Sequence, residues 1–216
     1  MLEPLPDRYR AVVFDLDGLL LDTEDLWRGA ETELFREHGQ TFTFDDKLAV
    51  MGTSFEHTAG YFAQRLGSAP QEGTALVNRL YEIMEGLLRL QVQGRPGAIE
   101  LVDRLRGRVP MALASNSSRQ LVSTALSTAG LTDAFDAIVT ADDVDAGKPA
   151  PDIYLLACER LGVPPEDSLA LEDSPSGIAA AKAAGLACIA VPQFAETDVS
   201  EADRVIDSLE ELLAET

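Results

Sequence analysis

The 216-residue sequence predicts an α/β fold: a doubly wound parallel sheet with a small, all-helical second domain inserted after the first strand. Two observations predict this fold. Short apolar runs recur along the chain with helical patterns between them, and one long stretch near the N-terminus holds helical patterns alone. Near-continuous apolar runs are typical of strands that are buried on both faces, as in a parallel sheet.

Five apolar runs are the expected strands, and four apolar stripes between them are the expected helices. The strands are residues 11–14, 111–114, 137–139, 169–171 and 187–191, and the helices are residues 99–105, 122–129, 153–161 and 175–184. Gly130, Gly162 and Gly185 follow three of these stripes, and glycine commonly ends a helix. Strands that alternate with helices in this way predict an open sheet with right-handed crossovers.

Residues 21–93 interrupt the alternation. Their apolar residues recur at helical spacing in four segments, which turn signals at Gly39, Gly52 and residues 67–70 separate. The alternation resumes at the turn 94–97. We therefore expect a core domain of residues 1–20 and 94–216, and a helical cap domain of residues 21–93 between two crossing linkers.

Composition and charge exclude several classes of protein. A hydrophobic fraction of 46% is typical of a soluble globular protein, and no run approaches the roughly 20 apolar residues that a membrane span needs. The net charge of −20 repels phosphate backbones, so nucleic acids and anionic membranes are not expected partners. The same charge repels small phosphorylated ligands, so a phosphate site here needs concentrated local positive charge.

The N-terminal residues indicate the compartment in which we expect the protein. Residues 1–7 lack the basic and apolar regions of a signal peptide, so we expect a cytoplasmic protein.

Cys158 and Cys188 lie in apolar surroundings, which favours two buried free thiols over a disulfide. Two distant cysteines and two isolated histidines do not form a zinc site. A monomer is the default expectation.

Polar residues directly after the apolar runs are the candidate functional residues, because ligands of open α/β sheets bind beyond the carboxyl ends of the strands. Asp15 and Asp17 follow the first run, and alternation along an extended segment places both on one side. A calcium-binding EF-hand loop that began at Asp15 would need glycine and glutamate where this chain has Leu20 and Leu26. A surface turn is the remaining alternative, but an acidic pair at the mouth of a buried strand favours a functional site.

Three later loops add further polar groups. Ser115 and Asn116 follow the second run, where a hydroxyl and backbone N–H groups suit a phosphate or the cap of the next helix. Lys148 lies in a Gly-Lys-Pro turn after the third run, as a surface charge or as a cation beside a phosphoryl group. Glu172 and Asp173 follow the fourth run, where the alternative role is to complement a helix dipole.

Taken together, the candidate residues include four carboxylates at one edge of the expected sheet: Asp15, Asp17, Glu172 and Asp173. Four carboxylates cannot all be ionised at close range without a cation between them. An all-oxygen set of ligands suits Mg²⁺, a hard cation that keeps water ligands and bridges to substrate phosphate. The sequence therefore predicts a magnesium site at the sheet edge, with Mg²⁺ as the cofactor.

These residues resemble the haloacid dehalogenase-like (HAD) hydrolase superfamily, in the helical-cap branch that includes β-phosphoglucomutase-like enzymes and sugar-phosphate phosphatases. Four motifs occur in the family's order: Phe14-Asp15-Leu16-Asp17-Gly18, Ser115-Asn116-Ser117, Gly147-Lys148-Pro149 and Glu172-Asp173-Ser174. Flanking segments agree as well, so the resemblance covers essentially the whole chain. It implies a Rossmann-like catalytic core with a helical cap.

The resemblance also implies roles for the acidic residues. Asp15 would attack phosphorus to form an aspartyl-phosphate, and Asp17 would protonate the leaving alkoxide and then activate water. Mg²⁺ would be held by the Asp15 carboxylate, the Asp17 backbone carbonyl and Asp173. Glu172 would assist directly or through water.

The remaining motif residues would bind the phosphoryl group. Ser115 and the Asn116 backbone would hold its oxygens, and Lys148 would offset charge there and on Asp15. Asp17 supplies the acid that an alkoxide leaving group needs, whereas family members that attack carbon typically lack this second aspartate. The resemblance therefore implies a phosphate ester as the substrate.

Phosphatase and mutase activities differ in what they require of the cap. A β-phosphoglucomutase keeps a histidine in the first cap helix and an arginine in the cap loop, and the corresponding residues here are Trp27 and Phe55. This departure favours hydrolysis of a small phosphorylated metabolite, such as a sugar phosphate, and leaves a mutase as the alternative. The two aromatic side chains have two alternative roles: packing within the cap, or contact with the substrate.

Overall fold

The computed structural model describes residues 8–50, 53 and 55–216. The chain divides into two compact units: Met1–Asp22 with Val92–Thr216, and Thr23–Gln91. The boundaries expected from the sequence, at residues 20 and 94, each lie two residues from this division. The expected turn at Gly52 and the N-terminal residues 1–7 lie outside the described residues.

The first unit contains a six-stranded parallel sheet in the order β3-β2-β1-β4-β5-β6. The strands are β1 (Ala11–Phe14), β2 (Met111–Ser115), β3 (Ala137–Thr140), β4 (Ser168–Glu172), β5 (Ala187–Ala190) and β6 (Arg204–Val205). The predicted α/β fold class is confirmed. Strand β6 was not expected, because a pair of residues is too short to carry a periodic signal.

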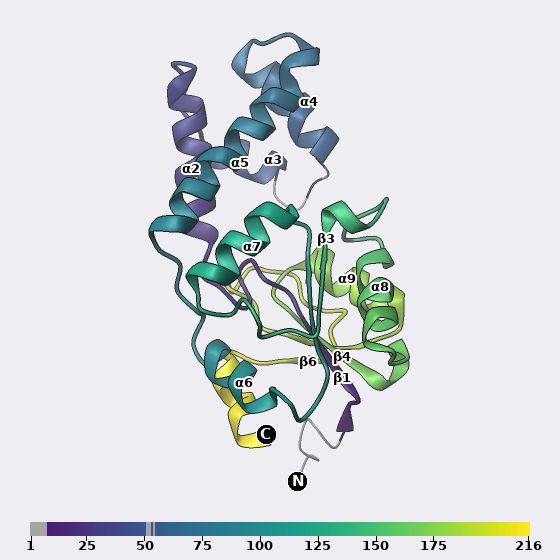
Figure 1. Cartoon of the computed structure of the whole chain (residues 1–216). Helices are drawn as coiled ribbons and strands as arrows, with labels where there is room; N and C mark the ends of the chain where they lie inside the picture. Colours follow the sequence, from purple (N-terminus) through teal and green to yellow (C-terminus); the bar gives the residue numbers. More distant parts are fainter. Residues whose placement is uncertain (1–7, 51–52, 54) are drawn as a thin grey trace. The chain divides into compact units, whose positions relative to one another are not determined.

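Helices cover both faces of this sheet, as expected of a doubly wound fold (Figure 1). The helices are α6 (Ala98–Leu105), α7 (Arg119–Thr128), α8 (Asp152–Leu161) and α9 (Pro175–Ala184), with short 3₁₀ helices η2 (Ala141–Asp143), η3 (Pro165–Asp167) and η4 (Leu209–Glu215). Helices α8 and α9 end at Gly162 and Gly185, whose left-handed φ angles are +67° and +91°. Glycine adopts this conformation without steric cost, so it ends the two helices where the sequence predicted.

The core of this unit lies around the central strands. All four residues of β1 are fully buried, and Val13 pairs with Ala112 of β2 and Ala170 of β4. Burial on both faces explains why the strands read as continuous apolar runs. Cys158 and Cys188 are buried within this core as free thiols, as predicted.

The second unit is all-helical in its described residues. Its helices are α2 (Glu24–Glu37), α3 (Phe44–Val50), α4 (Phe55–Leu66), η1 (Pro70–Glu72) and α5 (Gly73–Leu90). Helix α5 packs along α2 and α4, and their shared core includes fully buried Phe35, Phe62 and Met84. None of the helices in the described parts of the chain has the length and apolar character that crossing a membrane requires.

A buried carboxylate joins α3 to α4 within the helical unit. Asp46, 1% exposed, accepts hydrogen bonds from the Tyr61 hydroxyl at 2.7 Å and from Arg65 Nε at 2.8 Å. The backbone N–H and the hydroxyl of Thr43 donate to the other carboxylate oxygen at 2.8 and 2.7 Å. These donors hold the pKa of Asp46 below its usual value despite the opposing effect of burial.

Gly97, at the start of α6, lies so close to the η4 backbone that a side chain there would clash. Its φ is +77°, and a Cβ there would lie 2.5 Å from the Glu210 backbone nitrogen. Gly107 has a similar φ of +71° but open space around it. We expect Gly107→Ala to lower the free energy of unfolding by about 1–2 kcal/mol, because an L side chain is strained in the left-handed region.

Gly97→Ala should cost at least about 1 kcal/mol more than Gly107→Ala, because the backbone of η4 must also move. Urea denaturation of both variants measures the difference. Equal losses would contradict a close approach of η4 to Gly97.

Candidate active site

The carboxyl ends of β1 and β4 bring three carboxylates together. Phe14 pairs with Leu171, and the Asp15 N–H donates to the Leu171 carbonyl at 3.1 Å, so Asp15 lies level with the end of β4. One carboxylate oxygen each of Asp15, Glu172 and Asp173 lies within 4.8 Å of the other two. The structure thus gathers three of the four predicted carboxylates into one cluster.

Lys148 supplies positive charge to this cluster. Its ammonium donates to Asp15 Oδ1 at 2.5 Å, to Glu172 Oε1 at 2.6 Å and to the Ala114 carbonyl at 2.9 Å. An ammonium has three N–H donors, so these acceptors match its full capacity. Only 3% of the Lys148 side chain is exposed, which makes the alternative of a surface charge wrong.

Asn116 holds the loop that carries Lys148. Its side-chain Oδ1 accepts from the Lys148 backbone N–H at 2.8 Å, and its Nδ2 donates to the Lys148 carbonyl at 3.0 Å. Gly147 permits this approach, since a Cβ there would lie 2.6 Å from Asn116 Oδ1. The sequence singled out Asn116 for its backbone N–H, and this role of its side chain was missed.

Asp17 faces the serine turn after β2. Its Oδ2 accepts from Ser117 Oγ at 2.8 Å and from Ser115 Oγ at 3.3 Å, and Ser115 Oγ in turn accepts from the Ser117 N–H at 3.0 Å. Gly18, with φ at +91°, lets the Asp17 turn pass close to Asp173, because a Cβ at Gly18 would lie 2.2 Å from Asp173 Oδ2. Asp17 is not among the three carboxylates whose oxygens lie within 4.8 Å of one another, but its charge adds to burial in raising the pKa values of Asp15 and Asp173.

Glu172 is fully buried and satisfied by protein donors at both oxygens. Oε1 accepts from Lys148 and from the Tyr154 hydroxyl, each at 2.6 Å. Oε2 accepts from the Asp173 N–H at 3.1 Å and from the N–H and hydroxyl of Ser174 at 3.4 and 3.2 Å. Sequence reasoning missed Tyr154, which lies on α8 among apolar residues with no signal of a polar partner.

The electrostatics show that this cluster is short of positive charge. Burial raises the pKa of the Asp15 carboxyl to about 7, although the Lys148 charge opposes the shift. Burial, followed by the charges of Asp15 and Glu172, raises the pKa of Asp173 well above its usual value. Although burial disfavours its charged form, the Asp15 and Glu172 carboxylates raise the pKa of Lys148.

A divalent cation fits this set of residues. Asp15 and Asp173 hold protons more tightly than ordinary carboxyls, first because burial disfavours their charged forms and second because one ammonium does not balance three carboxylates. The ligand atoms available are oxygens, which a hard cation such as Mg²⁺ prefers.

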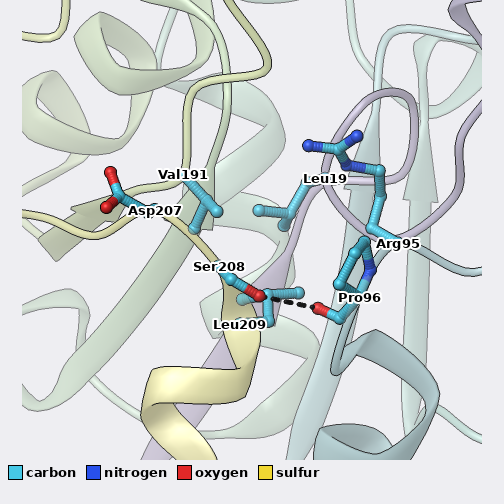
Figure 2. A pocket seen from close by; sticks show the side chains of 7 residues that line it. All are labelled: Leu19, Arg95, Pro96, Val191, Asp207, Ser208 and Leu209. Atoms are coloured by element: carbon cyan, nitrogen blue, oxygen red, sulfur yellow. Dashed lines mark hydrogen bonds between the residues drawn. The ribbon is translucent and has the colours of Figure 1, made fainter.

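A separate pocket lies in the same unit, between the turn after β1 and the segments after β5 and β6 (Figure 2). Its lining residues are Leu19, Arg95, Pro96, Val191, Asp207, Ser208 and Leu209. The Ser208 hydroxyl donates across it to the Pro96 carbonyl at 3.3 Å. None of these seven residues belongs to the candidate active site.

Several known proteins are similar in sequence to this chain. Protein SUPPRESSOR OF QUENCHING 1 of Arabidopsis thaliana is 39% identical over 196 residues, which cover 89% of this chain but only 18% of that protein. Validoxylamine A 7'-phosphate phosphatase of Streptomyces hygroscopicus subsp. limoneus is 34% identical over 209 residues, which cover 94% of this chain and 96% of that enzyme.

Solved structures share the fold over nearly the full length. The crystal structure of CbbY from Rhodobacter sphaeroides in complex with phosphate matches with a TM-score of 0.85 and 32% identity, covering 96% of this chain and 98% of that one. The family model for haloacid dehalogenase-like hydrolases matches residues 9–185, which include all four motifs. The chain belongs to the haloacid dehalogenase-like hydrolase family.

Proposed function

We propose that this chain is a Mg²⁺-dependent phosphatase that hydrolyses a small phosphate monoester through an aspartyl-phosphate intermediate. The chain is a hydrolase of phosphoric monoesters, as its named phosphatase relatives are. One observation carries the finer proposal: the Asp15 carboxylate, held by the buried Lys148 ammonium, lies beside two further carboxylates at a strand end. This arrangement combines an oriented nucleophile with a place for a cation.

The first step forms the intermediate. Lys148 holds Asp15 Oδ1, and a carboxylate oxygen of Asp15 attacks phosphorus while the bond between phosphorus and the ester oxygen breaks. Asp17 gives its proton to the departing alkoxide, so the alcohol leaves neutral. The Ser117 hydroxyl, which donates to Asp17 Oδ2 at 2.8 Å, orients the Asp17 side chain for this transfer.

The second step restores the enzyme. Asp17, now ionised, takes a proton from water as the water oxygen attacks phosphorus. The bond between phosphorus and the Asp15 oxygen breaks, orthophosphate leaves and both aspartates return to their starting states. The same residue thus acts first as acid and then as base.

Phosphate binding falls to Ser115, the Asn116 backbone and Lys148. The bond of 3.3 Å between Ser115 Oγ and Asp17 is long for two oxygens, so the hydroxyl can turn to a phosphoryl oxygen at little cost. The Asn116 side chain is engaged with the Lys148 loop, so the backbone N–H is the group of Asn116 that we propose for the ligand. Lys148 supplies positive charge that the acidic surface lacks.

The ligands proposed for Mg²⁺ are the carboxylates of Asp15 and Asp173 and the backbone carbonyl of Asp17. When bound, the ion offsets negative charge on the phosphoryl group and on the carboxylates. Glu172 assists through water, because both of its oxygens already accept hydrogen bonds from the protein. These hydrogen bonds favour assistance through water over direct coordination by Glu172.

The helical unit is proposed as the cap that selects the substrate. Trp27 and Phe55 each pack edge-to-face on Tyr81, with ring centroids 6.2 and 6.3 Å apart. Aromatic side chains at these two positions offer no charge for a second phosphate. This favours hydrolysis of a monophosphate, such as a sugar phosphate, and a mutase stays the alternative. We also propose that the enzyme acts as a monomer in the cytoplasm.

Replacing the nucleophile tests the mechanism. Asp15→Asn should lower kcat by roughly 10³-fold or more, because an amide does not form the phosphorylated intermediate. The assay is phosphate release from a panel of phosphorylated sugars and small metabolites, with Mg²⁺ and with a chelator. Asp103→Asn, at a side chain that is 64% exposed, is the matched control and should keep full activity.

Two results of that assay would contradict the proposal. Interconversion of sugar phosphates without net phosphate release would establish the mutase instead. Full activity of Asp15→Asn would show that Asp15 is not the nucleophile. Full activity of the wild-type enzyme in chelator would show that the reaction does not need a metal.

The raised pKa of Asp15 predicts pH-dependent cation binding. Below its pKa of about 7 the carboxyl is protonated, so Mg²⁺ must displace the proton. Apparent affinity should therefore rise with pH, by about tenfold per unit for each proton displaced, and level off once both Asp15 and Asp173, whose pKa is also raised, are ionised. Titration calorimetry at pH 6 and pH 8, in buffers of different ionisation enthalpy, measures the affinity and the protons released. Affinity that is independent of pH, without proton release, would refute this.

A further inference from the structure

We propose that Tyr154 is a positioning residue of this active site, which holds the Lys148–Glu172 pair so that the ammonium points at Asp15. The inference rests on the proposed function, since it assigns a role to a side chain that acts through Lys148. Neither the motifs nor the acidic cluster includes Tyr154. Three contacts join Tyr154, Glu172 and Lys148.

Tyr154 contacts both members of the ion pair. Its hydroxyl donates to Glu172 Oε1 at 2.6 Å, and the same oxygen accepts from Lys148 Nζ at 2.6 Å. Its ring centroid lies 5.1 Å from Lys148 Nζ, within the range of a cation–π contact. Tyr154 itself is fully buried in the core of the sheet unit, so it is a rigid support.

The three acceptors of Lys148 are not equally rigid. The Ala114 carbonyl belongs to β2 and is held by the sheet, whereas the position of Glu172 Oε1 depends on its side-chain contacts. The donors on Oε2 come from Asp173 and Ser174, on the other side of the carboxylate. Tyr154 is the donor that, with Lys148, holds Oε1 in place. Without the Tyr154 hydroxyl, Lys148 is the one donor to Oε1 that remains among the described residues, and the direction of Lys148 toward Asp15 loosens.

Local structure explains why a residue six positions after Lys148 lies at this point. The chain turns after Lys148, and α8 begins at Asp152, with the Tyr154 N–H donating to the Pro151 carbonyl at 3.0 Å. Helix α8 then packs on β1, β2 and β3. The lysine therefore enters the site from the loop, and the first turn of the helix places the tyrosine beside it.

Tyr154→Phe removes the hydroxyl and keeps the ring, so it tests the hydrogen bond alone. At saturating substrate and Mg²⁺ we expect kcat to fall about tenfold, within the range over which misplaced catalytic groups reduce rates, and KM to change less than twofold. The matched control is Tyr61→Phe in the helical unit, which breaks a similar bond of 2.7 Å to the buried Asp46 carboxylate. It should show a comparable fall in melting temperature with unchanged kcat.

The ammonium itself gives a second readout that needs no turnover. The chain has three lysines: Lys148, Lys47, which pairs with Glu24 and Glu31, and Lys182, which pairs with Asp203. In protein labelled with ¹⁵N-lysine, the signal that Lys148→Met removes identifies the Lys148 ammonium. Tyr154→Phe should shift and broaden this signal and leave the other two unchanged.

The outcomes separate the inference from the proposed function. If the wild-type enzyme releases phosphate and Tyr154→Phe keeps its kcat, or loses no more than Tyr61→Phe, the positioning role is refuted while the phosphatase stands. If the wild-type enzyme releases no phosphate from any ester, the proposed function fails. In that case an unchanged Lys148 signal in Tyr154→Phe refutes the inference as well, and a shifted signal supports it.

Discussion

The bonds of the buried Lys148 ammonium to Asp15, Glu172 and the Ala114 carbonyl are the interaction on which the site depends. Removing one partner of a buried, hydrogen-bonded ion pair leaves an uncompensated charge, which is strongly destabilising. The three acceptors come from the ends of β1, β2 and β4, which are neighbours in the sheet. One side chain from the loop after β3 therefore ties together three strand ends, and the geometry of the nucleophile follows from it.

Close backbone approaches make this arrangement sterically possible. A Cβ at Gly177 would lie 1.9 Å from Glu172 Oε1, and one at Gly18 would lie 2.2 Å from Asp173 Oδ2. At Gly147 it would lie 2.6 Å from Asn116 Oδ1, in the contact that holds the Lys148 loop. These glycines contribute no chemistry, but each leaves the space that a polar side chain of the site occupies.

The sequence predicted the fold and the place of the site because both rest on local signals. Buried parallel strands read as apolar runs, and the rule that ligands bind at the carboxyl ends of strands pointed to Asp15, Lys148 and Glu172. Tyr154 and the side-chain role of Asn116 had no such signal. Their contacts join residues 18 and 32 positions apart, and only the packing of α8 and of the Lys148 loop brings them together.

Glu172 belongs to the cluster of three carboxylates, but its oxygens already accept hydrogen bonds from the protein. Its two oxygens are occupied by Lys148, Tyr154 and the turn at Asp173 and Ser174, so its charge balances the ammonium. Lys148 is then shared between two carboxylates, and its charge neutralises Asp15 only in part. Because Lys148 is shared, it does not cancel the effect of burial, which raises the pKa of the Asp15 carboxyl to about 7. The charge of Glu172 adds to burial in raising the pKa of Asp15, so a cation that binds at this cluster has a proton to displace.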